Sequence, residues 1–139
     1  MAVSNYQDLI VWQKSMTLAK MVYAVVKKLP KEELYALSDQ IRRAVVSIPS
    51  NIAEGCARES KTELAYFLRI AKGSSAELET QLPLCSSIGY LQKQELNDIF
   101  SLLDEISRML RALLNPMSDV SGRLKRKTVS TNSELVTSN

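Results

Sequence analysis

Residues 47–55 read Ser-Ile-Pro-Ser-Asn-Ile-Ala-Glu-Gly and set a proline inside a segment whose apolar residues have helical spacing. The stretch is compatible with an active-site loop, a break between two helices, or a bend in one helix. The apolar spacing continues through Pro49, which favours the bent helix. Pro49 lacks the N–H that would bond the carbonyl of Val45, at a cost of roughly 3 kcal/mol in a regular helix. The residues that keep the spacing are Ile41, Ala44, Ile48 and Ile52.

Small and polar residues surround this proline and are expected to support the bend. We predict that Asn51, together with Ser47 and Ser50, bonds the backbone groups that the proline leaves free. Glu54 is expected to anchor the bend to an arginine. Gly55, which follows it, is expected to let helices or subunits approach closely.

The composition argues against catalysis. The chain has 139 residues and no histidine, which removes Ser-His-Asp and Cys-His nucleophile pairs and the commonest metal ligand. Glu77 and Glu79 are two residues apart, so they do not share a helix face. Together with Glu54 they would need the Glu-x-x-His motif of di-iron bundles, which is absent. We therefore expect no enzymatic activity, no cofactor and no metal site.

The sequence also bears on location. No stretch approaches the roughly 20 apolar residues of a membrane span. The N-terminus lacks the basic and then apolar regions of a signal peptide. Cys56 and Cys85 are far apart and are expected to be reduced, small apolar residues. We expect a cytoplasmic protein that does not associate with membranes.

Four segments of the sequence have helical periodicity, which predicts an all-α, antiparallel up-down-up-down four-helix bundle. The first segment ends near Leu29, and the second begins after Pro30 and ends at Gly55. The third begins at the capping-box motif of residues 60–63, bends at Pro83 and ends near Gly89. We assign residues 1–115 to the bundle and residues 116–139 to a flexible, disordered basic tail.

Two features of these helices concern packing between subunits. Gly73 lies in the small-residue run of residues 73–76, where a neighbouring helix could approach closely. The first and fourth helices carry apolar residues on more than one face, and one bundle core cannot easily cover both stripes, so we predict a homo-oligomer. The alternative is that the extra apolar residues form a thick core within one protomer. The first stripe has the spacing of a helical seam and is taken as core: Leu9, Trp12, Met16, Ala19, Tyr23 and Val26. The second is Val11, Leu18, Val22 and Val25.

Three motifs resemble a known family. They are "DLIVWQKSM" near the N-terminus, "LPKEELYALSDQIRRAVVSIPSNIAEGCAR" and "FLRIAKGSSAELETQL". In content and order they resemble the four-helix-bundle family of 23S rRNA intervening-sequence proteins. The accessory variability determinant proteins of diversity-generating retroelements are similar in fold. The resemblance extends from about Tyr6 to Leu113, and Pro83 departs from the apolar residue usual after "TQL".

The resemblance implies a four-helix protomer in a ring-like homopentamer that is non-enzymatic and associated with nucleic acid. The retroelement relatives partner a reverse transcriptase and bind its template RNA. The rRNA relatives are encoded within an insertion in the large-subunit rRNA gene.

Candidate nucleic-acid-binding residues are the basic side chains, because arginine and lysine pair with phosphate. An alternative for Arg42 and Arg43 is structural pairing with Glu54, Glu77 or Glu79 across the helices. Trp12 could stack on a base, but its position in the seam favours the core. The candidates are Arg42, Arg43, Arg58, Lys61, Arg69 and Lys72 in the bundle, and Arg123, Lys125, Arg126 and Lys127 in the tail.

Two functions follow from these observations. The first is an oligomeric accessory protein that binds RNA or DNA, with a reverse transcriptase or rRNA as further partners. The second is a protein-interaction scaffold that does not bind nucleic acid.

Overall fold

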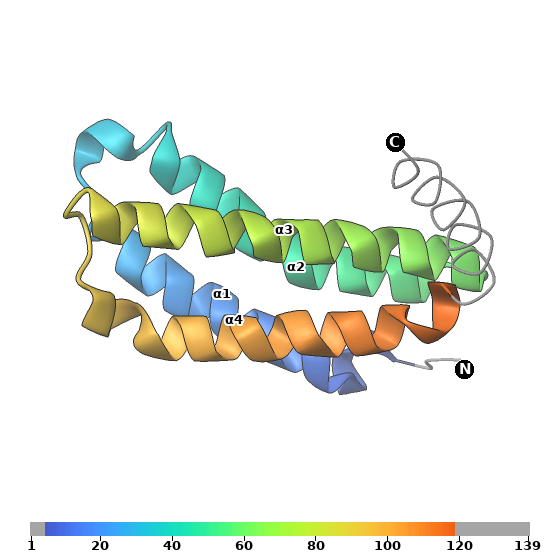
Figure 1. Ribbon diagram of the computed structural model, residues 1–139. Helices are drawn as coiled ribbons and strands as arrows, with labels where there is room; N and C mark the ends of the chain where they lie inside the picture. Colours follow the sequence, from blue (N-terminus) through green and yellow to red (C-terminus); the bar gives the residue numbers. More distant parts are fainter. Residues whose placement is uncertain (1–4, 119–139) are drawn as a thin grey trace, which may run out of the picture.

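The computed structural model describes residues 5–118, and within this range it contains helices and no strand. Short connections join the α-helices, and consecutive helices run in opposite directions along the bundle (Figure 1). The predicted all-α fold is therefore confirmed. The α-helices are α1 (Ile10–Val26), α2 (Leu37–Ala57), α3 (Lys61–Ser87) and α4 (Lys93–Leu114), with the 3-10 turns η1 (Tyr6–Asp8), η2 (Lys31–Glu33) and η3 (Pro116–Ser118).

The packing follows the order of the chain, so that each helix contacts two neighbours. α2 packs against α1 and α3, and α4 packs against α3 and α1. The buried side chains form one continuous core between them. Met117 of η3, which the sequence analysis assigned to the tail, packs against this core. No described helix has both the length and the apolarity needed to cross a membrane.

The core-facing stripe of α1 differs from the predicted one. The structure buries the second stripe through Val11, Leu18 and Val22. Of the predicted seam, Met16 and Tyr23 are exposed, whereas Val26 is buried. Leu9, Trp12 and Ala19 are half-buried against the core, and the Trp12 ring makes an edge-to-face contact with Tyr6. Heptad spacing alone could not distinguish the stripes, because both are apolar and only the positions of α2 and α4 decide which is covered.

The second helix begins later than predicted. Residues 31–33 form the turn η2, and α2 starts at Leu37, whose N–H donates to the Glu33 carboxylate at 3.3 Å. Leu34, which was expected on the buried face, is therefore 45% exposed. The Tyr90 hydroxyl donates to the same Glu33 carboxylate at 3.0 Å, and this bond raises the pKa of Tyr90.

The helix α2 runs through Pro49 without a break, as predicted, and the proline is buried. The supporting hydrogen bonds differ from the expected ones. The Asn51 amide donates to the Ser47 carbonyl at 2.8 Å and to the Ser47 hydroxyl at 2.9 Å, not to the carbonyl of Val45. Ser74 of α3 donates to the same Ser47 hydroxyl at 2.8 Å. The polar residues before and after the proline thus tie α2 to α3.

The helix α3 begins and ends where the sequence predicted. The Ser60 hydroxyl accepts from the Glu63 N–H at 3.1 Å, but the Glu63 carboxylate contacts the Ser60 hydroxyl instead of its backbone N–H. The helix is continuous through Pro83. It ends before Gly89, whose φ of +85° lies in the region that favours glycine, and the Tyr90 N–H bonds the Cys85 carbonyl.

The two helical glycines have opposite surroundings. A Cβ on Gly55 would lie 3.0 Å from the Cβ of Phe67 and 3.1 Å from a methyl group of Leu64. α2 and α3 approach closely here, as predicted. A Cβ on Gly73 would meet no other atom within 4 Å, so the expected close packing at Gly73 is absent within the protomer.

This difference predicts opposite effects of the same substitution. Gly73→Ala should raise the free energy of unfolding by about 0.5–1 kcal/mol, since alanine favours the helix and has room. Gly55→Ala should lower it by about 1–3 kcal/mol, because the new methyl group forces α2 and α3 apart. Urea unfolding followed by circular dichroism measures both. Equal stabilisation by the two substitutions would contradict the close approach at Gly55.

Candidate nucleic-acid interface

The first pair of predicted basic residues is engaged within the protomer. The Arg42 guanidinium lies over the Tyr23 ring, 5.7 Å from its centroid. Arg43 pairs with Asp39 one turn earlier, at 3.0 Å. The predicted alternative of pairing across helices with Glu54, Glu77 or Glu79 is therefore wrong, because both arginines find partners nearer than α3.

Arg58 is also engaged, at the end of α2. It bonds the Glu54 carboxylate at 3.0 Å, and its guanidinium lies 5.0 Å from the centroid of the Phe67 ring. Glu54 therefore has the arginine partner that the sequence predicted. The pair secures the α2–α3 corner, since Phe67 belongs to α3 and contacts the site of Gly55.

Arg69 and Lys72 on α3 are exposed and form no ion pair or hydrogen bond with any described residue. Lys72 is two helical turns before Glu79, whose carboxylate accepts from the Ser107 hydroxyl of α4 at 2.9 Å. The two cations therefore lie on the flank of α3 that faces α4.

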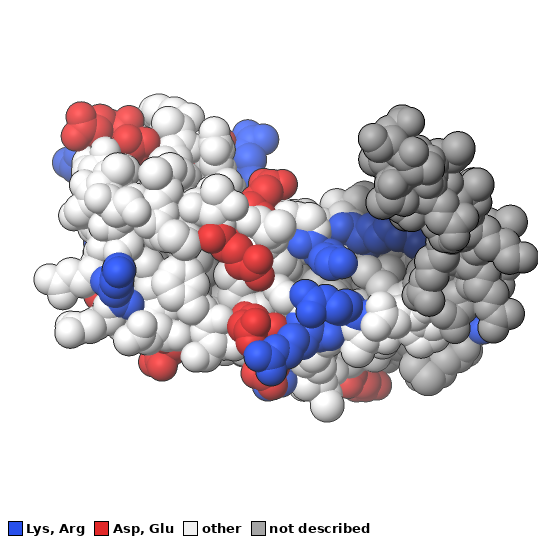
Figure 2. All heavy atoms as spheres, in the orientation of Figure 1, with Lys and Arg blue, Asp and Glu red and all other residues white. Residues whose placement is uncertain are grey.

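Arg111 lies opposite them on α4. It is one turn after Ser107, which places it on the flank of α4 that faces α3. Its side chain is exposed, and it makes no ion pair with a described residue. Arg69, Lys72 and Arg111 are called the α3–α4 strip below. Figure 2 shows Lys and Arg side chains gathered over the first half of α3 and the second half of α4, beside a group of Asp and Glu at the middle of the bundle.

Arg111 was not among the basic residues predicted from the sequence. Its position in the last turn of a helix favours a solvated cation near the helix dipole, so the residue had no distinguishing signal. The register of α3 against α4 is the missing information. Only the hydrogen bond between Ser107 and Glu79 shows that Arg111 and Lys72 lie on facing flanks, and the sequence does not predict this contact.

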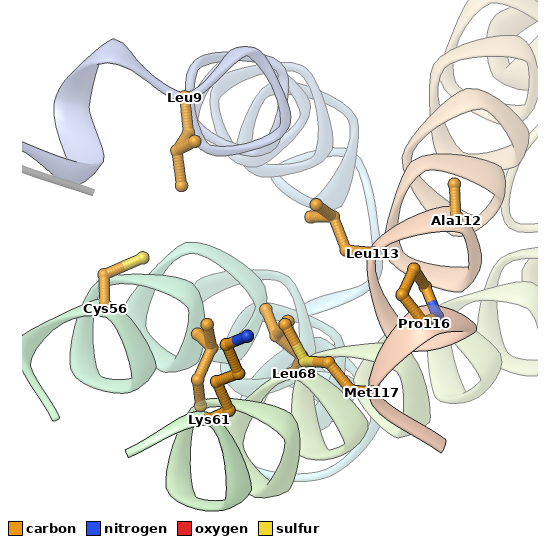
Figure 3. A pocket seen from close by; sticks show the side chains of 9 residues that line it. Leu9, Cys56, Lys61, Leu68, Ala112, Leu113, Pro116 and Met117 are labelled. Carbon is orange, nitrogen blue, oxygen red and sulfur yellow. The ribbon is translucent and has the colours of Figure 1, made fainter. Parts of the chain in front are cut away.

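Lys61 lies apart from the strip, at the rim of a cavity at one end of the bundle (Figure 3). The four predicted tail residues, Arg123, Lys125, Arg126 and Lys127, lie outside the described residues. The structure thus separates the predicted basic set. Of the predicted arginines in the described range, Arg42, Arg43 and Arg58 at α2 are engaged, whereas Arg69 is unpaired on α3 beside Lys72.

The acidic side chains considered for catalysis do not converge. Glu79 bonds Ser107, and Glu77 lines a shallow groove beside Gly73. Over residues 5–118, no three Cys, Asp or Glu side chains are close enough together to hold a metal ion. What the described residues bring together is a cationic surface.

An exposed apolar surface lies on the other side of the bundle, between α1 and α2. Tyr23 contacts Arg42, and Leu9 lines the same cavity as Cys56, which fixes an antiparallel register between the two helices. This register sets Met16 opposite Pro49 and Val46 opposite Ala19, so Met16 and Val46 lie about one helical turn apart along the α1–α2 boundary. We call Met16, Tyr23 and Val46 the α1–α2 face, and their exposed fractions are 37%, 39% and 41%.

The sequence model of the 23S rRNA-intervening sequence protein family matches residues 7–112 of the chain. The chain belongs to this family. The match covers all four α-helices except the last residues of α4. No curated protein matches the chain.

A solved structure supports the family assignment. It is the crystal structure, at 1.70 Å resolution, of a protein of unknown function from the S23 ribosomal protein family of Bacteroides thetaiotaomicron. It is 26% identical in sequence, with a TM-score of 0.71. The similarity covers 76% of this chain and 99% of the Bacteroides chain. The four-helix fold of this 23S rRNA-intervening sequence protein is thus shared with a crystallographically determined relative.

Proposed function

We propose that this 23S rRNA-intervening sequence protein is a non-enzymatic, oligomeric accessory protein of the cytoplasm that binds nucleic-acid backbone through the α3–α4 strip. The observation that carries the proposal is the exposure of three cations without internal partners on facing flanks of α3 and α4. Cations already paired within a protein gain less from phosphate, because they must first release their partners.

The chemistry of the strip suits phosphate and not base edges. The two arginines can each bond two phosphate oxygens, and the lysine adds a point charge. The strip consists of exposed side chains that suit phosphate oxygens, so we infer binding without sequence preference. An oligomer would repeat the strip, and weak contacts would then add by multivalency.

RNA is the first ligand to test. The name of the family refers to an insertion in 23S rRNA. The sequence also contains a basic run at residues 123–127, five residues after the last described residue, which adds further cations to the chain. A reverse-transcriptase partner, and a likeness to the accessory proteins of diversity-generating retroelements, stay predictions from the sequence resemblance.

A second candidate function is a protein-interaction scaffold, for which the exposed apolar side chains of the α1–α2 face supply the contact between protomers. The two functions are separable, because the α1–α2 face and the α3–α4 strip use different helices. We infer that this face mediates self-association into the predicted pentameric ring. A protein partner recovered after nuclease treatment, without RNA binding, would favour the scaffold.

The binding proposal predicts that the triple variant Arg69→Glu, Lys72→Glu and Arg111→Glu loses at least about tenfold in affinity for single-stranded RNA. The slope of log affinity against log salt should also become shallower by about two, since roughly 0.7 counterion is released per contact. Fluorescence anisotropy at several salt concentrations measures both.

The matched control introduces the same change of charge on a different part of the surface. Lys20, Lys27 and Lys31 are exposed and unpaired among the described residues, so their change to glutamate removes the same charge away from the strip. The control should retain most of the affinity. Equal losses in the two variants, or binding that ignores salt, would refute the strip as the binding surface.

The self-association proposal predicts that Met16→Glu with Val46→Glu dissociates the oligomer while the helical content is unchanged, because charges on a buried apolar interface are costly. Ala24→Glu, at an exposed position of α1 outside this face, is the control and should leave the oligomer intact. Analytical ultracentrifugation gives the mass of each variant. An oligomer that survives the double substitution would exclude this face as the interface.

A further inference from the structure

A cavity of about 330 Å³ opens at the end of the bundle where α2 meets α3 and α4 ends. Figure 3 shows Leu9, Cys56, Leu68 and Leu113 around the opening, contributed by four different parts of the chain. Met117 of η3 lies beside Leu68 and closes one side. The volume is near the lower end of the range for small-molecule sites, roughly 300–1,000 Å³.

The inner surface of this cavity is apolar. Leucine side chains, a proline and a methionine form most of it, and they offer no hydrogen-bond donors or acceptors. The Cys56 thiol faces the same space, and burial raises its pKa, so the group is uncharged at neutral pH. A ligand that fills the interior must therefore be a hydrocarbon, since a polar group there would lose its hydration without compensation.

The rim carries one cation. Lys61, the first residue of α3, lines the cavity and is exposed. Within residues 5–118 its ammonium forms no ion pair, whereas nearby Arg58 is held by Glu54. An apolar interior with an unpaired cation at its mouth is complementary to a hydrocarbon chain that ends in an anion.

We propose that this cavity binds the alkyl chain of a single-chain fatty carboxylate, with the carboxylate at the rim beside Lys61. A nucleobase does not suit the same space, because the interior presents no groups that could bond its edges. A long polar peptide is excluded by the same argument. The inference is independent of nucleic-acid binding, since the α3–α4 strip does not line the cavity.

The test uses the full chain and dodecanoate below its micelle concentration, followed by isothermal titration calorimetry. We expect saturable binding of one dodecanoate per protomer. Each methylene added between octanoate and dodecanoate should tighten binding by about fourfold while the chain still enters the cavity. Dodecanoate should also slow alkylation of Cys56 by a maleimide, and Cys85 is fully buried and gives no competing signal.

Two substitutions locate the ligand. Leu113→Trp enlarges a half-buried side chain that points into the cavity and should weaken binding at least about tenfold. Leu84→Trp makes the same change at an exposed position of α3 away from the cavity and should leave binding unchanged. Lys61→Met should weaken dodecanoate up to about fivefold, as expected for an exposed ion pair, and should leave dodecanol unaffected.

The outcomes are distinguishable. Absence of dodecanoate binding overturns the proposal. This result is expected if another part of the chain fills the cavity. Binding that is equal in the Leu113→Trp and Leu84→Trp variants also overturns it, since it would indicate adsorption to an exposed apolar surface. If Leu113→Trp does not fold, the proposal is tested by the dependence of affinity on alkyl-chain length and by the protection of Cys56 from alkylation. Absence of either effect overturns it. Dodecyltrimethylammonium that binds as tightly as dodecanoate would refute the role of Lys61.

Discussion

The close approach of α2 and α3 is the constraint on which the other features depend. Gly55 gives α2 no side chain at the crossing, so the backbone of α3 comes within contact of it at Leu64. The Ser47 hydroxyl accepts from Asn51 and Ser74, which joins the two helices where Pro49 interrupts the hydrogen bonding of α2. The stretch that could have been an active-site loop is thus the packing surface of one continuous helix.

The position of α3 then determines the two outer surfaces. With α3 fixed against α2, its opposite flank meets α4 through Glu79 and Ser107, and this register brings Arg111 to within about one helical turn of Lys72. On the other side, α2 covers the stripe of α1 that contains Leu18 and leaves Met16 exposed. A single protomer therefore separates a cationic surface from an apolar one. Such a division would allow the proposed self-association and nucleic-acid binding to proceed without competition.

Much of the fold could be predicted from the sequence, because periodicity and end signals are local. The helix through Pro49, the serine that begins α3 and the glycine that ends it were all anticipated. The buried stripe of α1 was not, because both of its stripes are apolar and the choice depends on neighbouring helices. The candidate site was predicted least well. Arg42 and Arg43 were plausible cations in the sequence, but only coordinates reveal their partners Tyr23 and Asp39. Arg111 became a candidate only through the α3–α4 register.

The family relationship agrees with the four-helix fold, and the Bacteroides relative of unknown function shares it at 26% identity. We propose that α3 and α4 present the surface for nucleic acid. Photocrosslinking of the full-length protein to single-stranded RNA containing 4-thiouridine, followed by mass spectrometry, tests it most directly. Crosslinked peptides should come from α3 around Arg69 and from the end of α4 around Arg111. Crosslinks confined to α1 and the first half of α2 would exclude α3 and α4 as the nucleic-acid surface.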